Sequence, residues 1–461
     1  VDGEAISGNT YTVTGDIEIT VEGLPKIDGL SFNSDGEYYE IGSTDALIAL
    51  ASYVNEGHDC AGLKFKLTTD LDLTDATFTA IEGFNGEFDG DGKLIVTDKA
   101  IFSESTGTIS NGYYYGTSIG AFTPVYKINL PSNVAVNANS DAKITLDSET
   151  YYKAGSNVTI DDENYTINAD NYYYVDENGK NRIAAAKILT GNETSLDGGT
   201  YIVFGNVEIN NQLTFNGNAN LILADGAKLT VNSSGYGIKA NGTLNIYGQT
   251  LGTGKLEANG FQNGIWTAGN YDDEDNLIGG NVNISGGTVE ATSNYGSGIG
   301  LYGDINISGG KVDATGTHGG IDAKGNVNIT GGKIKATGTH IGGYHDTYGI
   351  GISADYGNIN LSWTNADDYV DANRFSGNIT FNKEFFNADG NTNQTSGKLY
   401  AKSGFMVELP AGVSIEGIPK VDDANKYICA GEITLKLADG VAIDDSDCVK
   451  ISYPNFFELL S

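Results

Sequence analysis

The sequence is poor in several residue types, and each shortage narrows the class of protein. Its 461 residues include 6 Pro, 1 Met and 3 Cys. Cys60, Cys429 and Cys448 are too few for a disulfide framework; Cys429 and Cys448 could pair, but three buried thiols are the simpler interpretation. No run of about 18 apolar residues is present, so no membrane insertion is expected within this chain.

Positive charge is also scarce. The chain has 26 Lys and Arg against 60 Asp and Glu, which gives a formal net charge of −34. A nucleic-acid partner is not expected, because phosphates require a basic surface. Divalent cations and neutral ligands remain compatible with this charge. No signal peptide is visible, and Val1 begins directly on polar sequence, which indicates a mature or trimmed chain.

Glycine, in contrast, is abundant, with 64 residues, and it recurs inside a repeat at residues 281–338. Each of three copies reads Val or Ile, Asn, Ile, Ser or Thr, Gly, Gly. The first apolar positions of the copies are Val282, Ile305 and Val327, which are 23 and 22 residues apart. A period in this range, without a Gly-X-Y pattern, indicates a solenoid.

Within one copy, the pattern predicts strands and corners. Val282 and Ile284 alternate with asparagines, as in a half-buried strand. Gly286-Gly287 predicts a corner where a side chain would clash or φ must be positive. We therefore expect a mainly β chain, a right-handed parallel β-helix with small β-sandwich-like modules. Equivalent charged positions should form solvent-facing ladders on successive coils: Lys311 with Lys333, and Glu290 with Asp313 and Lys335.

The chain divides into four expected parts. They are an N-terminal β-helical segment with one helix (1–121), a small β module (122–180), the parallel β-helix (181–395), and a second small β module that could be truncated (396–461). The helix should start near the N-cap candidate Ser43 and end at Gly57. Similar strand order in the two small modules favours a duplication, with chance likeness among strands as the alternative.

Two stretches resemble known families. The helix, then FKLTTDLDL and AIEGFNGEFDGDGKLI, within residues 38–112, resembles the GLUG-type repeats of bacterial surface proteins. Residues 172–385, with GGTYIVFGNVEI, GGNVNISGGTVEAT and GNINLSWTNADDYVDANRFSGNITF, resemble a family of large secreted proteins from anaerobic, often host-associated bacteria. These resemblances imply a β-helical, adhesin-like protein, extracellular or on the cell surface. Its partner would be an extracellular glycan or a host or bacterial surface protein.

Parallel β-helices also include polysaccharide lyases and glycoside hydrolases. A hydrolase needs two carboxylates across a cleft, and a lyase needs calcium ligands with a strong base, commonly Arg. The only arginines are Arg182 and Arg374, outside the regular coils. The acidic, His and Arg motifs typical of polygalacturonases are missing. We therefore predict a non-catalytic protein with no catalytic residues, and keep a polysaccharide-binding module, a lyase or a glycoside hydrolase as alternatives.

Acidic residues offer a candidate calcium site. Asp272, Asp273 and Asp275 lie in an insertion between coils, and oxygen-rich groups of this kind suit Ca²⁺. The twelve-residue calcium loop is not matched, so a solvated acidic loop is the alternative. No cofactor is certain, and Ca²⁺ is the one candidate that these acidic residues would suit.

Histidines offer a candidate transition-metal site. His318 and His340 are 22 residues apart and follow the same Ala-Thr-Gly-Thr motif, so they should stack on adjacent coils about 4.8 Å apart. Together with His345 they could chelate a metal. The alternative is a ladder of surface histidines derived from the repeat.

Aromatic residues recur in the loops of successive coils, where a row of rings can stack on sugars. The predicted ligand-binding residues are Trp266, Tyr295, Tyr302, Tyr344 and Tyr348; Tyr356 belongs to the same row. The alternative is that these rings pack the loops onto the solenoid.

Overall fold

The computed structural model describes residues 24–271, 277–340, 349–363, 365, 367–372 and 375–381. Five further strands are described by their backbone: β43 (Lys398–Glu408), β44 (Val413–Ile415), β45 (Lys426–Ile433), β46 (Leu435–Leu437) and β47 (Val449–Ile451). The chain forms two compact units. The first contains residues 1–127 and 139–156, and the second contains 128–138 and 157–461.

The predicted helix is observed in the first unit as α1 (Thr44–Asn55). Ser43 is its N-cap, and the Ser43 Oγ accepts a hydrogen bond from the backbone N–H of Ala46 at 3.1 Å, which satisfies a helix donor that has no intrahelical partner. Beyond the helix, Gly57 has φ +91°. The apolar face of α1, including Leu47 and Leu50, is fully buried.

Short parallel strands form the coils of the first unit. One row contains β2 (Tyr38–Ile41), β3 (Lys64–Leu67), β6 (Glu87–Asp89) and β9 (Thr108–Ser110), with β1 (Ser31–Asn33) antiparallel at its edge. A second row contains β4 (Leu71–Asp72), β7 (Leu94–Thr97), β10 (Tyr113–Gly116) and β11 (Thr123–Tyr126). A third pairs β5 (Ile81–Glu82) with β8 (Phe102–Ser103). The inward side chains of these rows pack with the buried face of α1 to form one hydrophobic core.

Residues 122–180 contribute antiparallel strands to both units. In the first unit, β11 pairs antiparallel with β14 (Glu149–Lys153), and β14 pairs antiparallel with β13 (Lys143–Leu146). The short 3-10 helix η1 (Ser140–Ala142) directly precedes β13. In the second unit, β12 (Val136–Ala138), β15 (Asn157–Ile160) and β16 (Glu163–Thr166) form a three-stranded sheet. The expected duplication of this module at 396–461 stays a prediction, because much of that segment lies outside the described residues.

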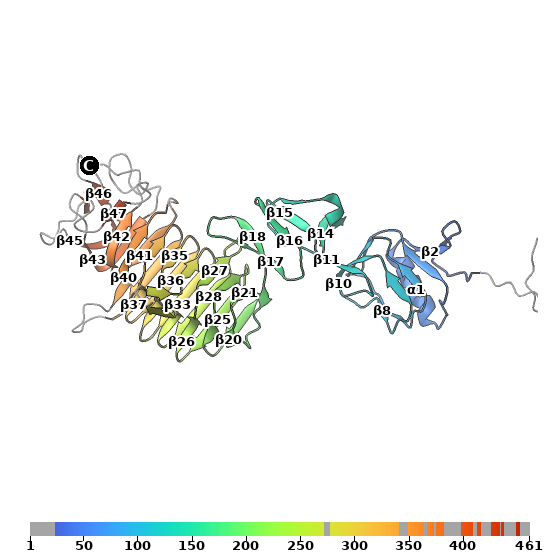
Figure 1. Cartoon of the computed structure of the whole chain (residues 1–461), viewed down its shortest axis with the longest axis horizontal. Helices are drawn as coiled ribbons and strands as arrows, with labels where there is room; N and C mark the ends of the chain where they lie inside the picture. Colours follow the sequence, from blue (N-terminus) through green and yellow to red (C-terminus); the bar gives the residue numbers. More distant parts are fainter. Residues whose placement is uncertain are drawn as a thin grey trace, which may run out of the picture. The chain divides into compact units, whose positions relative to one another are not determined.

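The second unit is a parallel β-solenoid with three faces, so the predicted parallel β-helix is confirmed. Within the described residues, the parallel coils of the two units make about 14 turns. The first face is a stack of β22 (Asn206–Ile209), β25 (Lys228–Ser233), β28 (Lys255–Gly260), β33 (Thr288–Ser293), β36 (Lys311–Gly316), β39 (Lys333–Gly338) and β41 (Tyr369–Ala372). Figure 1 shows the coils of this unit lying side by side in chain order.

The other two faces follow in each coil. The second face contains β20 (Ser195–Leu196), β23 (Leu213–Phe215), β26 (Tyr236–Ala240), β29 (Asn263–Thr267), β34 (Ser297–Leu301), β37 (Gly319–Ala323) and the start of β40 (Ile350–Leu361). The third face contains β19 (Lys187–Ile188), β21 (Gly199–Val203), β24 (Ala219–Leu223), β27 (Leu244–Gly248), β32 (Val282–Ile284), β35 (Ile305–Ile307), β38 (Val327–Ile329) and the end of β40. The strand β42 (Phe375–Phe381) pairs with both parts of β40.

Four further strands form two antiparallel pairs beside the coils. A hairpin of β17 (Asn171–Val175) and β18 (Asn181–Ala185) lies against the third face, where Val175 pairs with Gly248 of β27. The insertion between β29 and β32 begins and ends in β30 (Gly269–Tyr271) and β31 (Leu277–Gly279), which pair antiparallel.

The register follows the repeat. Val282 pairs with Ile305 and Ile305 with Val327, and all three are fully buried. The second glycine of each corner has a positive φ: +72° at Gly287 and +78° at Gly310. A Cβ on Gly310 would also lie 2.6 Å from the carbonyl oxygen of Gly287 one coil earlier. Both reasons considered for glycine at this corner therefore apply at the same residue.

Outward side chains form ladders along the stack. The predicted charge ladder is present on the first face, where Lys335 Nζ lies 3.0 Å from Asp313 Oδ2 and Lys255 Nζ lies 2.9 Å from Glu290 Oε1. The third face carries an asparagine ladder that starts at Asn220, whose Nδ2 donates to Thr200 Oγ1 at 3.0 Å. On each later coil the Asn Nδ2 donates to the Asn Oδ1 of the preceding coil at 2.5–2.7 Å: Asn245, Asn283, Asn306, Asn328 and Asn360. These bonds fix the side chains of neighbouring coils relative to one another.

A search of the described residues finds no helix long and apolar enough to cross a membrane.

Candidate ligand-binding groove

Two adjoining hollows cross the second face and form one groove. One is about 310 Å³ and the other about 170 Å³ in volume. They share His318, Asp322 and Lys324, and they extend from Trp266 on β29 to Ser376 on β42. At the usual strand spacing, four steps between these strands cover about 19 Å. We call this the lateral groove.

Repeat positions with different side chains create the hollow. On the outer surface, Trp266, Gly300, Asp322 and Ser353 pair in sequence across β29, β34, β37 and β40. Gly300 therefore leaves a notch between the large indole and the carboxyl group. A Cβ at Gly300 would collide with the amide nitrogen of Asn263, whose side chain lies over this position.

Trp266 and Tyr302 form the aromatic wall at one end of the groove. The Trp266 ring stacks on Tyr236 with centroids 4.6 Å apart, and Tyr302 meets its edge at 6.2 Å. Lys239 Nζ lies 5.5 Å from the centroid of Trp266. Gly279 allows Tyr302 to pack closely against the backbone of β31, because a Cβ at position 279 would lie only 2.7 Å from Tyr302 Cβ. The wall is therefore held by packing on several sides.

Charged side chains form the other end. Lys324 Nζ forms an ion pair with Asp355 Oδ2, and Asp355 Oδ1 accepts from Ser353 Oγ at 2.9 Å. Asp322 accepts from Ser297 Oγ at the long distance of 3.4 Å. Among the described lining residues, Lys324 is the only Lys or Arg, and Asp355 already neutralises it.

Burial changes the protonation of these groups. It raises the pKa of the Asp322 carboxyl, and the charge of Asp355 acts in the same direction, while Lys324 opposes both. Burial also lowers the pKa of His318, so this imidazole is neutral at pH 7. For Lys324, burial opposes protonation, but the bond to Asp355 and the charge of Asp322 outweigh it and raise the pKa. The described residues that line the groove therefore offer no unpaired cation at neutral pH; Lys239 lies beside the Trp266 ring but is not among them.

The raised pKa predicts that Asp322 reduces stability. Because the folded pKa exceeds the unfolded one, ionisation disfavours the fold as pH rises above the unfolded value of about 3.9, and the full loss is reached above the folded pKa. Asp322→Asn should raise the urea midpoint at neutral pH and give no gain below the unfolded value. Asp313→Asn, which removes the partner of Lys335, should give no gain at either pH. A neutral-pH loss of stability in Asp322→Asn would contradict this prediction.

The structure brings some of the sequence-predicted ligand residues together. Trp266 and Tyr302 lie in the groove wall, and His318 lies at its centre. Tyr295 lies on the adjacent turn instead, 60% exposed, between Phe261 at 6.0 Å and His318 at 5.4 Å. Tyr356 is 74% exposed. Tyr344 and Tyr348 lie outside the described residues.

The predicted metal ligands are only partly described. His340 lies one coil beyond His318, and its N–H donates to the carbonyl of Thr317 at 3.2 Å, as the repeat predicts. The remaining predicted ligands lie outside the described residues: His345, Asp272, Asp273 and Asp275. Within the described part of the chain, no group of three or more His, Cys, Asp or Glu side chains is placed to hold a metal ion. Cys60 is a buried free thiol, and Cys448 lies outside the described residues, so the Cys429–Cys448 pairing stays a prediction.

Most of the groove residues were not predicted from the sequence, and the polar ones among them that the argument uses include Asn263, Asp322, Lys324 and Asp355. A usable signal exists for two of them. The repeat reads Gly-Ile-Gly-Leu-Tyr at 298–302 and Gly-Ile-Asp-Ala-Lys at 320–324. The inward residues of both copies are apolar, whereas the outward residues change from Gly300 and Tyr302 to Asp322 and Lys324. Such a change at outward positions indicates residues that the solenoid core does not require.

Comparison with known proteins gives no relative. No family model, curated protein or solved structure matches the chain. The fold and the geometry of the groove therefore carry the functional argument.

Proposed function

We propose that the protein is a non-catalytic, adhesin-like carbohydrate-binding protein, secreted or held at a bacterial cell surface, whose lateral groove binds a neutral glycan. The observation that carries this proposal is the aromatic wall of Trp266 and Tyr302 facing Asp322 across the notch at Gly300. A sugar ring has apolar C–H faces and a rim of hydroxyls. An indole can stack on the apolar face of the ring, and a carboxyl group can form hydrogen bonds with its hydroxyls.

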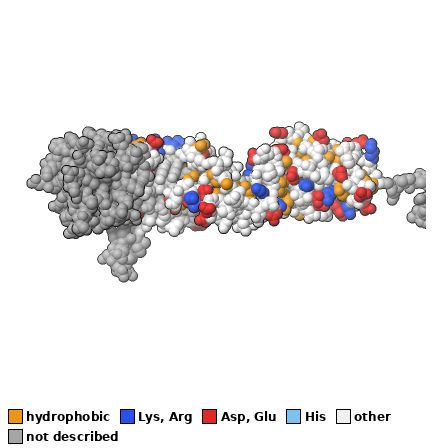
Figure 2. All heavy atoms as spheres, turned by 90° about the horizontal axis from the view of Figure 1, so that it is seen from above, with side chains coloured by type: hydrophobic (Ala, Val, Ile, Leu, Met, Phe, Trp, Pro, Cys, Tyr) orange, Lys and Arg blue, Asp and Glu red, His pale blue; other side chains and the backbone are white. Residues whose placement is uncertain are grey.

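The charges of the groove support a neutral ligand. A polyuronate would need a free cation, and Lys324 is held by Asp355. Moving a carboxylate ligand beside Asp322 would add repulsion in a partly buried site. Figure 2 shows acidic and basic side chains interspersed on the described part of the face that it draws.

Binding to a panel of soluble neutral and uronate-containing polysaccharides tests this proposal. Trp266→Ala should weaken binding to a neutral glycan by about thirtyfold, equivalent to about 2 kcal/mol, because the stacking surface is lost. Phe204→Ala removes a 43% exposed ring near Tyr172 and serves as the control, with affinity unchanged.

A second variant separates a binding defect from misfolding. Asp322→Asn should be at least as stable as the natural chain at neutral pH, yet bind the glycan more weakly. Unchanged affinity in both Trp266→Ala and Asp322→Asn, or preferential binding of uronate polymers, would disprove the proposed site. Parallel measurements with calcium and with a chelator test the predicted Ca²⁺ site at Asp272, Asp273 and Asp275.

Glycan hydrolysis is a second candidate function, favoured by one observation. Asp322 and Asp355 lie on adjacent coils of one outer surface in unlike surroundings: burial raises the pKa of Asp322, whereas Asp355 is ion-paired. Unlike environments of two carboxyl groups are typical of an acid and base pair. Release of reducing sugar that is abolished in both Asp322→Asn and Asp355→Asn would favour this function over binding alone.

A further inference from the structure

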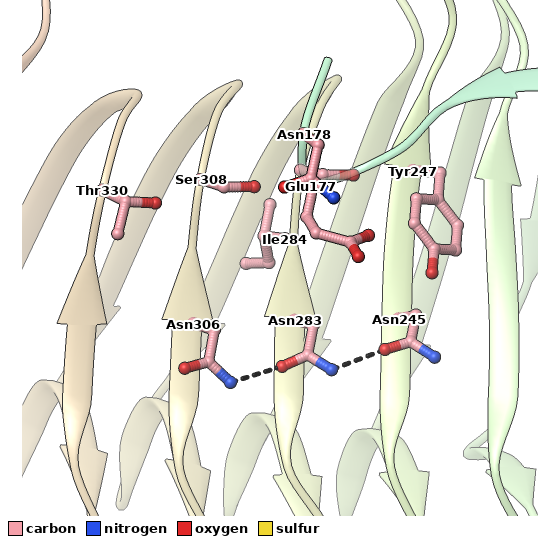
Figure 3. A pocket seen from close by; sticks show the side chains of 10 residues that line it. Glu177, Asn178, Asn245, Tyr247, Asn283, Ile284, Asn306, Ser308 and Thr330 are labelled. Carbon is pink, nitrogen blue, oxygen red and sulfur yellow. Dashed lines mark hydrogen bonds between the residues drawn. The ribbon is translucent and has the colours of Figure 1, made fainter. Parts of the chain in front are cut away.

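A second cavity lies on the third face, away from the lateral groove. Its volume is about 430 Å³. The tip of the β17–β18 hairpin bounds it on one side, and residues of β27, β32 and β35, with Ser285, Ser308 and Thr330 from the turns that follow β32, β35 and β38, bound it on the other. Figure 3 shows Glu177 reaching from the hairpin toward the strands, on the side of Asn283 and Tyr247. The cavity thus combines two segments that are far apart in the sequence.

The hairpin is fixed to the solenoid. Besides the strand pairing of Val175, Gln249 Nε2 donates to the carbonyl of Tyr173 at 3.0 Å. The rings of Tyr174 and Tyr247 lie with centroids 4.4 Å apart. These contacts place the hairpin tip over the asparagine ladder rather than leaving it as a free loop.

The hairpin tip itself is also held. Asp176, only 8% exposed, accepts the backbone N–H groups of Asn178 and Lys180 at 2.9 and 2.8 Å. Its other oxygen lies 3.0 Å from Arg182 Nε. Arg182 is therefore engaged by Asp176, and the neighbouring Glu177 projects from an ordered turn.

Glu177 is the only charged residue that lines this cavity in the described structure. No described hydrogen bond or ion pair engages its carboxylate. Burial raises the pKa of Tyr247 to about 12, with further contributions from Tyr174 and Glu177, so the phenol stays protonated beside this carboxylate. The local field favours a positive group, and the net charge of −34 favours the approach of a cation.

The opposite wall offers matched donors and acceptors. Each ladder asparagine in the cavity, such as Asn283, uses one N–H and one oxygen lone pair along the ladder. One N–H and one lone pair remain. Ser308 and Thr330 add hydroxyl groups on successive coils. A hydroxyl-rich ring can pair with these groups, whereas the methylene chain of a simple polyamine would leave them without hydrogen-bond partners.

We propose that this cavity binds an amino sugar with a free ammonium group. The ammonium pairs with the Glu177 carboxylate, and the sugar hydroxyls bond to Asn283, Asn306 and Ser308. This site is independent of the neutral-glycan groove, because its residues belong to another face and to the hairpin.

Calorimetric titration of the full chain with glucosamine oligomers at mildly acidic pH tests the site. Glu177→Gln should weaken binding about tenfold or more, because a charge-assisted bond becomes a neutral one. Glu208→Gln, an exposed glutamate on the first face, is the matched control and should leave affinity unchanged. Ser308→Ala should cause a smaller loss, and Trp266→Ala should have no effect here.

Two ligand controls make the proposal specific. N-acetylated oligomers of the same length lack the ammonium and should bind at least about tenfold more weakly. Spermidine carries ammonium groups without hydroxyls and should also bind more weakly. Equal affinity for acetylated oligomers, equal affinity for spermidine, or full affinity in Glu177→Gln would each overturn the assignment.

Discussion

Replacing Ile307 with aspartate is expected to lower the free energy of unfolding by more than about 4 kcal/mol. Ile307 is fully buried, and its in-register neighbours Ile284 and Ile329 are also apolar. A carboxyl group placed there has no polar partner inside the solenoid, and the coil must either bury it or open. Urea unfolding followed by circular dichroism measures the loss, and a variant that fails to fold meets the same expectation.

Thr288→Asp is the matched control for this prediction. Thr288 faces outward on the first face, in register between Lys255 and Lys311. The same new carboxylate is there placed beside two lysines in solvent, so the change should stay within about 0.5 kcal/mol. Similar losses in the two variants would show that Ile307 is not the interior position that the structure assigns to it.

Gly310→Ala is expected to cost about 3 kcal/mol. The left-handed backbone at φ +78° disfavours any side chain by about 1–2 kcal/mol. The new methyl would in addition lie 2.6 Å from the carbonyl oxygen of Gly287, so backbone must move in a stack that is closely packed.

Gly252→Ala separates the cost of the left-handed backbone from the cost of the steric clash. Gly252 also has a positive φ, +61°, but no heavy atom lies within 4 Å of the Cβ it would gain. Its substitution should cost about 1 kcal/mol, the backbone contribution alone. Equal urea midpoints for the two variants would indicate that the coil spacing at Gly310 relaxes without penalty.

The solenoid was predictable because its interior is specified locally. Val282 and Ile284 alternate with polar residues, the glycine pair ends the strand, and the same order returns one period later. Parallel stacking of identical coils then brings Val282 to Ile305 without any long-range information. Period, corner and charge ladder are all confirmed for this reason.

The groove was only partly predictable, because its shape depends on register between unlike coils. Trp266 and Tyr302 were identified from their residue type. Asp322 and Asp355 are 33 positions apart in the sequence, with an insertion between them, and only the pairing of Asp322 with Ser353 shows that they share a surface. The cavity under the β17–β18 hairpin was harder still, since Tyr173 and Gln249 are joined across 76 positions.

The last coils have a property that the regular ones lack. Every solenoid coil from β21 to β42 adds a strand in the same direction as the one before, but β47 pairs antiparallel with β42, and β45 pairs antiparallel with β43. A parallel edge left open would present the same hydrogen-bonding template that each coil offers to the next. Reversing the strand direction changes the hydrogen-bonding pattern at these two strands, so the described β45 and β47 do not present the parallel template that each regular coil presents. Among the described strands, the edges of β42 and β43 that could accept a further parallel strand are thus paired with reversed strands instead.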